Sequence, residues 1–480
     1  MSTRIEHDLI GDKEISNDCY YGVQTARAAE NFHITGVTLS GFPTFIESLA
    51  KVKKAAALAN CELGILDEKK KNAICEACDE IISGKYHDQF VVDMIQGGAG
   101  TSTNMNANEV IANIGLELMG YKKGEYKYLH PNNDVNLSQS TNDAYPTALR
   151  VALYEKLGEL TESMKIIKKS FANKACEFKD IIKMGRTQLQ DAVPMTLEQE
   201  FRTYAVMIAE DIQRVSEARQ LVREMNMGAT AIGTGINAHP EYSKLVESKL
   251  QEVTGRPFVT AGDLIEATQD TGAYVQISGV LKRVATKMSK ICNDLRLLSS
   301  GPRTGFNEIN LPAMQPGSSI MPGKVNPVIP EVVNQVCFQV IGTDIAVTMA
   351  CEGGQLQLNV FEPLIAYNLF NSINMMKNAF ETLAYTCVDG ITANKERCLA
   401  QVLNSIGLVT ALNPYLGYEN STIVAKEALE TGGSVYDIVL EKGFLEKEQL
   451  DEIIKPENMI QPKNYGLSEK SKFQSTVKGV

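Results

Sequence analysis

Four helical patterns of unusual length constrain the fold of this 480-residue chain more than any other feature. Periodic stretches beyond about 25 residues are typical of helix bundles and coiled coils. A 30-residue helix spans about 45 Å, which is longer than a compact monomer needs. The sequence therefore predicts a mainly α protein with a central bundle of long helices. The patterns cover residues 196–226, 263–300, 327–352 and 362–388.

The third pattern also bears on assembly. Residues Val328–Ala350 are apolar on most of the helix circumference, and a helix that is apolar all round is normally buried all round. An elongated single-chain bundle cannot cover such a helix from every side, so we expect other copies of the chain to do so. A thick monomeric bundle is the alternative.

Composition divides the chain into three parts. Residues 1–138 mix helical patterns, at Pro43–Cys61 and Lys69–Ile82, with Gly- and Asn-rich loops. Residues 139–393 contain the long helices, and residues 394–480 contain shorter helices and turns. The polar stretch at 468–480 is expected to fray.

The charge balance argues against several classes of partner. The chain has 47 basic and 58 acidic residues and a net charge of −11, which disfavours nucleic acid or an anionic membrane as the main partner. An anionic substrate must then be attracted by local cations and amides. The N-terminal residues lack the apolar core of a signal peptide, and no run of 18 apolar residues predicts a membrane span.

Cysteine and histidine usage predicts a cytoplasmic protein without a metal site. The ten cysteines are scattered, as expected of free thiols in a reducing compartment. Cys75 and Cys78 form one C-x-x-C, but a zinc site of this kind needs a second pair or nearby histidines. The five histidines show no metal-binding spacing.

The eleven residues Gly317–Pro327 (GSSIMPGKVNP) form the most informative polar segment. Two prolines remove backbone donors and two glycines permit positive φ, so an irregular loop is expected. The loop carries hydroxyls at Ser318 and Ser319, a cation at Lys324 and an amide at Asn326, with apolar residues between them. This composition suits a loop that folds over a small anion, and an ordinary Pro–Gly turn is the alternative.

Two further segments place hydroxyl and amide groups before apolar helical patterns. Residues 100–109 and 136–143 lie where Ser, Thr and Asn commonly cap a helix. In the first segment the polar residues outnumber what capping needs, so ligand contact is favoured. In the second, Ser140, Thr141 and Asn142 would lie at a helix N-terminus, which attracts carboxylates.

A last polar segment, residues 184–194 (MGRTQLQDAVP), is bounded by glycine and proline. It is expected to be a loop that enters the long helix from Thr196. Its polar side chains are equally compatible with a solvated surface and with ligand binding.

These segments resemble the signature regions of the fumarase/aspartase superfamily. Residues 317–327 are close to that family's pattern G-S-S-x-M-P-x-K-x-N, and the resemblance covers nearly the whole chain. Residues 20–32 (YYGVQTARAAENF) match best the members that release ammonia. The family implies a mainly α, three-domain subunit with a central long-helix bundle. It also implies a homotetramer whose active sites are shared between subunits.

The resemblance implies a role for each polar residue in an elimination that yields fumarate. Ser318 is expected to remove the C3 proton, helped by Lys324 and by loop N–H groups that stabilise its alkoxide. The resulting aci-carboxylate needs fixed donors. The residues expected to hold it are Thr101, Thr187 and Gln188. Those expected at the other carboxylate are Lys324, Asn326, Ser140 and Thr141, and Ser319 and Asn142 complete the substrate-binding set.

Gln188 distinguishes between the reactions of the superfamily. Fumarases have a histidine here, paired with an acid that corresponds to Glu331, and water elimination needs such a proton donor. An α-ammonium group leaves as ammonia without one, and the carbonyls of Gln188 and Asn142 can accept its hydrogen bonds. The expected reaction is reversible deamination of L-aspartate to fumarate and ammonia. Some deaminating members keep histidine, so this position mainly argues against fumarase.

Two alternatives stay open: a class II fumarase, and a catalytically silent, crystallin-like protein on the same scaffold. No cofactor is expected to be required, and the resemblance leaves room for a divalent cation such as Mg²⁺ as an activator. His130–Asp134 resembles a secondary dicarboxylate site of fumarases and is equally compatible with a plain turn.

Overall fold

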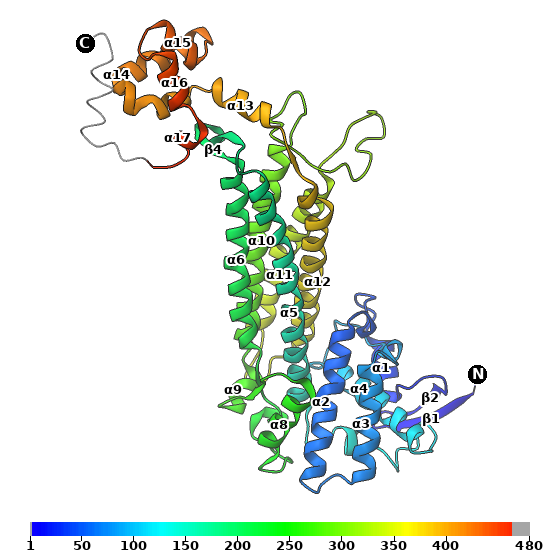
Figure 1. Cartoon of the computed structure of the whole chain (residues 1–480). Helices are drawn as coiled ribbons and strands as arrows, with labels where there is room; N and C mark the ends of the chain where they lie inside the picture. The colour runs from blue at the N-terminus through cyan, green and yellow to red at the C-terminus, as the bar shows by residue number, and fades with distance from the viewer. Residues whose placement is uncertain (1, 463–480) are drawn as a thin grey trace. The chain divides into compact units, whose positions relative to one another are not determined.

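The structure, a computed structural model, describes residues 2–462 and is mainly helical, which confirms the predicted fold class (Figure 1). The fraying expected at 468–480 concerns residues outside this range. The chain forms two compact units, and the three-part division by residue number stays a prediction. Unit 1 comprises residues up to Glu162, Asp211–Thr286 and Val336–Lys377, and unit 2 comprises Ser163–Glu210, Lys287–Gln335 and residues from Asn378 onward.

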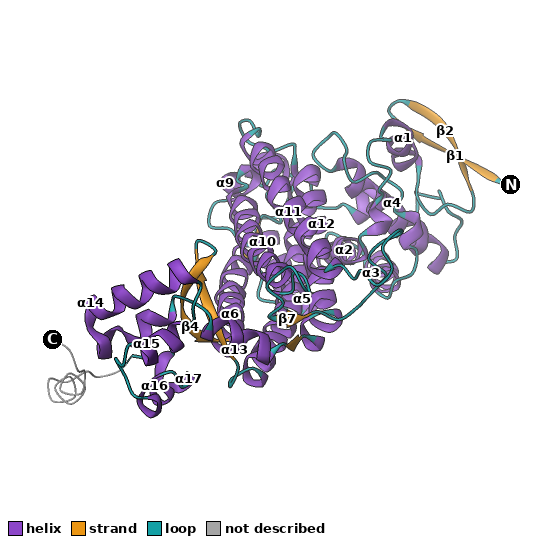
Figure 2. Ribbon diagram, turned by 90° about the horizontal axis from the view of Figure 1, so that it is seen from above, coloured by secondary structure: helices purple, strands orange, loops and turns teal. Residues whose placement is uncertain are grey.

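Five long helices contribute residues to both units, and within each unit their segments run side by side (Figures 1 and 2). Their existence confirms the bundle of long helices that the periodicity predicts. The five are α5 (Thr141–Glu177), α6 (Leu197–Leu221), α10 (Gly272–Leu298), α11 (Val328–Glu352) and α12 (Glu362–Thr386).

For two of the long helices the predicted range was too long. The pattern over 196–226 ends as a helix at Leu221, and the pattern over 263–300 is interrupted after α9 (Leu264–Gln269). At the interruption the Asp270 carboxylate accepts a hydrogen bond from Gly272 N at 3.0 Å, so a new helix begins there.

The rest of unit 1 consists of shorter helices and small sheets. α2 begins at Pro43, where a helix needs no N–H. α3 is capped by Asp67, which accepts a hydrogen bond from Lys70 N at 3.0 Å. Both predicted helices of this region are confirmed. The elements are β1 (Thr3–Asp8), β2 (Gly11–Ser16), α1 (Val23–Asn31), η1 (Leu39–Gly41), α2 (Pro43–Glu62), α3 (Glu68–Ile82), η2 (His87–Gln89), α4 (Thr101–Leu118), η3 (Pro131–Val135), β5 (Glu224–Met225), α7 (Thr230–Gly233), α8 (Tyr242–Thr254), β6 (Val259–Thr260) and α9.

Aromatic packing in unit 1 fixes the start of α5. The ring of Phe45 on α2 lies 5.5 Å from that of Tyr145 on α5 and 5.3 Å from that of Phe370 on α12. All three side chains are buried. Such edge-to-face and tilted contacts add to the free energy of burial, so the first turn of α5 is held against α2.

Apolar side chains in the described part of unit 2 are buried in more than one cluster. Phe171 of α5 packs against Phe201 and Tyr204 of α6, and Phe178, the residue after α5, packs against Phe201. The C-terminal helices bury a cluster of their own that includes Leu412. The elements outside the long helices are β3 (Ile182–Thr187), β4 (Gln190–Thr196), β7 (Ile309–Asn310), η4 (Val388–Gly390), β8 (Thr392–Ala393), α13 (Lys395–Leu403), α14 (Leu408–Thr431), α15 (Val435–Glu441), α16 (Lys447–Ile453) and α17 (Pro456–Met459).

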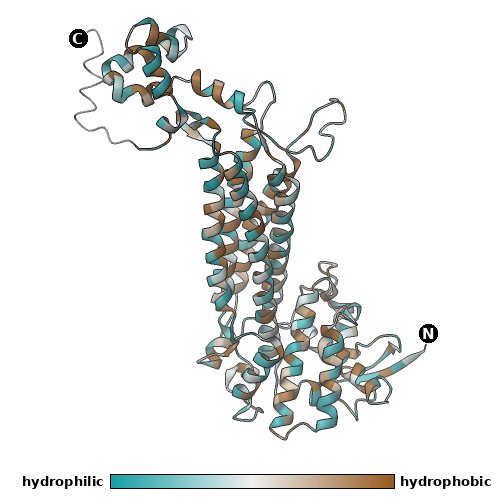
Figure 3. Cartoon of the chain, in the orientation of Figure 1, coloured by the Kyte–Doolittle hydropathy of each residue, from teal (hydrophilic) through white to brown (hydrophobic). Residues whose placement is uncertain are grey.

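One side of α11 is not covered by the described chain. Only 33% of its most apolar stretch is buried, and Phe338, Ile345 and Met349 are 60%, 64% and 67% exposed. Figure 3 shows apolar residues along the long helices. By length and composition α11 could cross a membrane, but a core helix of a soluble protein meets the same test.

Candidate active site

The segment Gly317–Pro327 forms the irregular loop that the sequence predicts. Gly317 N donates to the Lys324 carbonyl at 2.8 Å, and Asn326 Nδ2 donates to the Gly317 carbonyl at 2.6 Å, which closes the loop at its base. A Cβ at position 317 would lie 2.5 Å from the Lys324 oxygen. Glycine is therefore required for this close approach.

Backbone donors surround the Ser318 hydroxyl. Its oxygen accepts the N–H of Ile320 at 3.2 Å and of Met321 at 3.0 Å, and fixed donors of this kind stabilise negative charge. Lys324 is exposed, and within residues 2–462 its ammonium makes no hydrogen bond or ion pair. The loop thus offers an oxygen prepared to carry charge and a cation available to an anion. Ser319 is exposed beside them.

Thr187 and Gln188 lie on a β-hairpin, which corrects the loop predicted for 184–194. β3 pairs antiparallel with β4, Thr187 stands opposite Gln190, and Gln188 and Leu189 form the turn. Both turn residues have positive φ, of 55° and 60°, where Asn-Gly is the usual pair. Pro194 misled the prediction, because a proline is tolerated in an edge strand. Left-handed backbone at exposed, non-glycine positions is typical of functional sites.

A buried ion cluster fixes the base of this hairpin. Arg186 Nη1 lies 2.5 Å from Glu308 Oε1, and Lys183 Nζ lies 2.8 Å from Glu308 Oε2. Burial opposes protonation of Lys183, but the carboxylates of Glu200 and Glu308 outweigh it and raise its pKa. Sequence reasoning missed Glu308, because an isolated acid in an irregular segment carries no local pattern.

The residues Ser140–Asn142 lie at the N-terminus of α5, as predicted, and Asp143 caps that helix. Asp143 Oδ1 accepts the N–H of Ser140 at 2.9 Å. Its Oδ2 accepts the N–H groups of Gly228 and Thr230 at 3.2 and 3.1 Å. Burial raises the pKa of Asp143 to about 6, although these donors oppose the shift. The carboxylate joins the start of α5 to a distant turn.

A buried lysine lies behind the same helix start. Lys53 Nζ donates to Asn104 Oδ1 at 2.7 Å, to Asn136 Oδ1 at 2.9 Å and to Gln139 Oε1 at 2.8 Å, which uses all three ammonium donors. With its oxygen held by Lys53, Asn104 donates its Nδ2 to Thr141 Oγ1 at 3.1 Å. The Thr141 hydroxyl therefore accepts from the interior, and its proton is available for a ligand.

Sequence reasoning missed Lys53, although a signal was present. The lysine occurs on the buried face of α2 in register with Ile46, Leu49 and Asn60, and lysine is almost never fully buried without polar partners. Burial lowers the pKa of Lys53 to about 7, and the charge of Asp143 opposes this shift.

The polar run at 100–109 is mainly structural, so ligand contact is the wrong interpretation for most of it. No side chain caps α4. Asn104, Asn106 and Asn108 are buried and hydrogen-bonded to protein groups. Thr101 is exposed at the first position of α4, and its hydroxyl donates to a backbone carbonyl at 2.8 Å. A substrate contact of Thr101 stays a prediction.

A small cavity of about 250 Å³ lies beside the start of α5. Strained backbone gathers around it, because four of its lining residues have positive φ without being glycine. Such strain persists where the surrounding structure enforces it, commonly at functional sites. The cavity is lined by Ser138, Gln139, Ser140, Thr230, Ala231, Ile236 and Asn237, and the four strained residues are Ser138, Thr230, Ala231 and Asn237.

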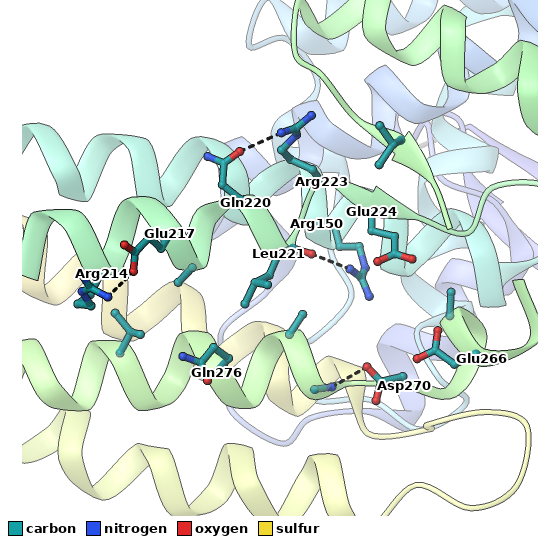
Figure 4. Close-up of a pocket in the computed structure, with 16 residues that line it drawn as sticks. Arg150, Arg214, Glu217, Gln220, Leu221, Arg223, Glu224, Glu266, Asp270 and Gln276 are labelled. Carbon is teal, nitrogen blue, oxygen red and sulfur yellow. Dashed lines mark hydrogen bonds and ion pairs between the residues drawn. The ribbon is translucent and has the colours of Figure 1, made fainter. Parts of the chain in front are cut away.

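A larger cavity of about 850 Å³ lies in unit 1 beside the C-terminal end of α6 and the N-terminal end of α10 (Figure 4). It contains none of the predicted site residues. Arg214 Nη1 is already paired with Glu217 at 2.7 Å, and Arg150 Nη1 donates to the Leu221 carbonyl at 3.3 Å. Acidic side chains complete its wall. Because the wall contains carboxylates and two of its arginines are already hydrogen-bonded, a dicarboxylate fits this cavity poorly despite the cavity's size.

No metal cluster of three or more ligating side chains occurs among the described residues. Burial raises the pKa of both Cys75 and Cys78, which disfavours the thiolates that zinc requires. His130 caps the π-helical turn Pro131–Val135, whose Asp134 pairs with Lys70 at 2.8 Å. A regulatory role for that segment stays open.

The predicted site residues fall into two sets. Unit 1 contains Thr101, Ser140, Thr141 and Asn142, and unit 2 contains Thr187, Gln188, Ser318, Ser319, Lys324 and Asn326.

Comparison with known proteins identifies the family. The model described as "Lyase" matches residues 11–342, and the model described as "Fumarase C C-terminus" matches residues 408–461. The aspartate ammonia-lyase of Helicobacter pylori is 68% identical over 459 residues, which cover 96% of this chain and 98% of that protein. This chain belongs to the aspartate ammonia-lyases. The resemblance to the fumarase/aspartase superfamily is thereby confirmed.

Solved structures extend the likeness to the fold. A fumarate lyase:delta crystallin from Brucella melitensis, bound to cobalt, has a TM-score of 0.93 and 54% identity over 95% of this chain and 99% of that one. A class II fumarase from Schistosoma mansoni has a TM-score of 0.91 and 34% identity over 96% of this chain and 100% of that one. Aspartate ammonia-lyases and fumarases therefore share the fold described above.

Replacing Lys53 by methionine tests whether the buried network positions Thr141. The change leaves the amide oxygens of Asn104 and Gln139 without a donor, each costing about 1–3 kcal/mol, whereas Asn136 Oδ1 keeps the donors of Asn104 and Asn108. We expect a lower Tm and weaker inhibition by succinate, measured by steady-state kinetics. Lys54→Met is the control, since Lys54 pairs at the surface with Asp79 at 2.6 Å. Succinate inhibition equal to wild type in folded Lys53→Met protein would contradict the role.

Proposed function

We propose that this aspartate ammonia-lyase converts L-aspartate reversibly into fumarate and ammonia, with Ser318 as the base. One observation carries the assignment of the base: the Ser318 oxygen accepts two backbone N–H groups in a loop that also bears Lys324, a cation without a partner among residues 2–462. A serine hydroxyl is too weak a base at neutral pH unless its alkoxide is stabilised. The two donors and the cation supply that stabilisation.

The elimination proceeds in two steps. The Ser318 alkoxide takes the C3 proton, and the electron pair of the broken C–H bond moves into the adjacent carboxylate, which becomes an aci-carboxylate. Donors on Thr187 and Gln188 hold that charge, and Thr101 joins them when its hydroxyl turns from the Gly98 carbonyl to the substrate. The pair then returns to form the C2–C3 double bond, and the C2–N bond breaks with its electrons going to nitrogen. Ammonia leaves, and fumarate remains.

The second carboxylate of the substrate gives it a fixed orientation. Lys324 supplies a charge-assisted bond, and Asn326, Ser140 and Thr141 add neutral donors. The Thr141 proton is available for this purpose, because its oxygen already accepts from Asn104. Ser319 and Asn142 complete the set.

The proposal excludes an organic cofactor and assigns any divalent cation, such as Mg²⁺, only an activating role. The net charge of −11 supports small anions bound by local donors over nucleic acid or membrane partners. None of the ten cysteines, which all lie within residues 2–462, forms a disulfide, and this supports a cytoplasmic location.

The reaction is tested by following fumarate absorbance with L-aspartate and L-malate side by side. We expect rapid turnover of aspartate and little or none of malate, because Gln188 has no proton to give to a leaving hydroxide. Faster turnover of malate would make the protein a fumarase, and no turnover of either would indicate a silent structural protein.

Ser318→Ala tests the base. We expect kcat to fall by about 10²–10⁴-fold, as a lost general base typically costs, with Tm unchanged because position 318 lies in a loop. The control is Ile320→Ala, whose side chain is 83% exposed in the same loop and whose N–H is retained. A kcat within tenfold of wild type would rule out the role.

We further propose a homotetramer in which α11 lies at the centre of a bundle formed by four chains. Phe338, Ile345 and Met349 are separated by seven and four residues, which places them on one face of the helix. Each is more than half exposed in the single chain. Burying such a side chain contributes about 1.5–3 kcal/mol, so association of these faces is favourable.

The tetramer has active sites that combine loops of different chains. We expect Ser318→Ala and Thr187→Val proteins to be inactive separately and to regain activity when unfolded and refolded together, because some hybrid sites contain both wild-type loops. Each variant refolded alone is the control. A monomer by light scattering, or inactive hybrids of verified composition, would refute shared sites.

A further inference from the structure

We propose that the turn Asn226–Ala231, held by Asp143, fixes the Asn142 side chain so that only its oxygen faces the substrate's ammonium group. The turn and Asp143 are then positioning elements that determine specificity for an amine. The proposal rests on the proposed function, in which Asn142 binds the substrate.

The orientation of Asn142 follows from its partner. Asn142 Nδ2 donates to the Ala231 carbonyl at 2.7 Å. A carbonyl only accepts, so the atom facing it must be the amide nitrogen. Within residues 2–462, Asn142 Oδ1 accepts no hydrogen bond, and it is therefore available to a donor.

The carbonyl of Ala231 is itself held in an unusual place. Ala231 has φ 44° and ψ −84°, close to the strained γ-turn that is rare in proteins, and Thr230 has φ 38°. Asp143 Oδ2 accepts the N–H of Gly228 and of Thr230. The Thr230 hydroxyl donates to the Ile236 carbonyl at 2.7 Å. These bonds enforce a backbone that the residues would not adopt alone.

A second attachment makes the arrangement rigid. Asn226 Nδ2 donates to the backbone carbonyl of Asn142 at 2.9 Å and to Thr268 Oγ1 at 3.1 Å. Asn142 is thus bound to one turn through both its backbone and its side chain. Ala231 also lines the small cavity beside Ser140, so the constrained amide lies next to a proposed carboxylate contact.

The fixed orientation matters because a free amide can present either of two faces. An ammonium group only donates hydrogen bonds, and it would be repelled by the Nδ2 face. A hydroxyl both donates and accepts, so it tolerates either face. Holding Nδ2 at Ala231 removes the unfavourable face and favours an amine over an alcohol.

Substitutions at position 231 separate backbone geometry from side-chain contact. Valine is disfavoured at positive φ, so Ala231→Val should move the backbone carbonyl of residue 231 away from Asn142 Nδ2. Glycine tolerates positive φ, so Ala231→Gly should retain it and serves as the matched control. Ala231 is exposed, which leaves space for the added methyl groups. Asp143→Asn is the second disrupting variant and decides the question if Ala231→Val does not fold. Its remaining oxygen can still accept the N–H of Ser140, while its amide nitrogen cannot accept from Gly228 and Thr230.

The measurements are the KM for aspartate, the KM for ammonia in the reverse direction, and the inhibition constant of succinate, which lacks an amino group. In both disrupting variants we expect the first two to rise about tenfold, as for a lost hydrogen bond to a charged group, while succinate inhibition changes less than twofold. Ala231→Gly should match wild type.

An equal rise in the KM for aspartate and in the inhibition constant of succinate would overturn the positioning role. Unchanged aspartate kinetics in Asp143→Asn would overturn it as well. A Gly variant as impaired as the Val variant would do the same. Absence of aspartate turnover in the wild-type protein would instead overturn the proposed function, so the two failures are distinguishable.

Discussion

The buried carboxylate of Asp143 is the interaction on which the ordered start of α5 depends. One of its oxygens satisfies the N–H of Ser140, and the other satisfies two N–H groups of a turn more than eighty residues away in sequence. Leaving a buried charge unpaired is costly, so the carboxylate keeps helix and turn together. Lys53 lies in the same interior and completes the polar network through Asn104. Asp143 and Lys53 together restrict the movement of Ser140, Thr141 and Asn142, three residues of the proposed site.

Such fixed polar groups are needed because the overall charge of the chain does not favour binding of an anion. A chain of net charge −11 cannot attract a dicarboxylate by its overall field. In the proposed site the attraction comes from fixed local groups: the helix start at α5, the N–H groups around Ser318, and the cation of Lys324. Fixed donors need no reorganisation when charge develops. The backbone strain at the Gln188 turn and around the small cavity is the structural cost of holding such donors in place.

The sequence predicted the parts of this design that have a local signature. Helical periodicity found four of the five long helices and missed α5, and the Gly and Pro pattern found the loop at 317–327. Prediction from the sequence failed where pairing between distant segments determines the structure. The hairpin at Gln188 appeared to be a loop, the asparagines of α4 appeared to be ligand contacts, and Glu308 carried no signal. These features depend on which residues meet in space, and only Lys53, a charge on a buried helix face, was detectable beforehand.

The exposed residues of the single chain have one physical explanation. Within the described part of the chain, Phe338, Ile345 and Met349 leave an apolar stripe on α11 uncovered, and Lys324 has no counter-charge. An apolar stripe of this kind is stabilised by a second apolar surface, and a free cation by an anion. In the proposed tetramer the first requirement is met by other chains and the second by the substrate. Assembly and substrate binding then act on the same long helices, because the loop that bears Lys324 leads directly into α11 at Val328. In the proposed tetramer, burial of the stripe therefore restrains the helix that follows the loop bearing Ser318 and Lys324. The stability of the assembly is thereby coupled to the geometry of the proposed reaction.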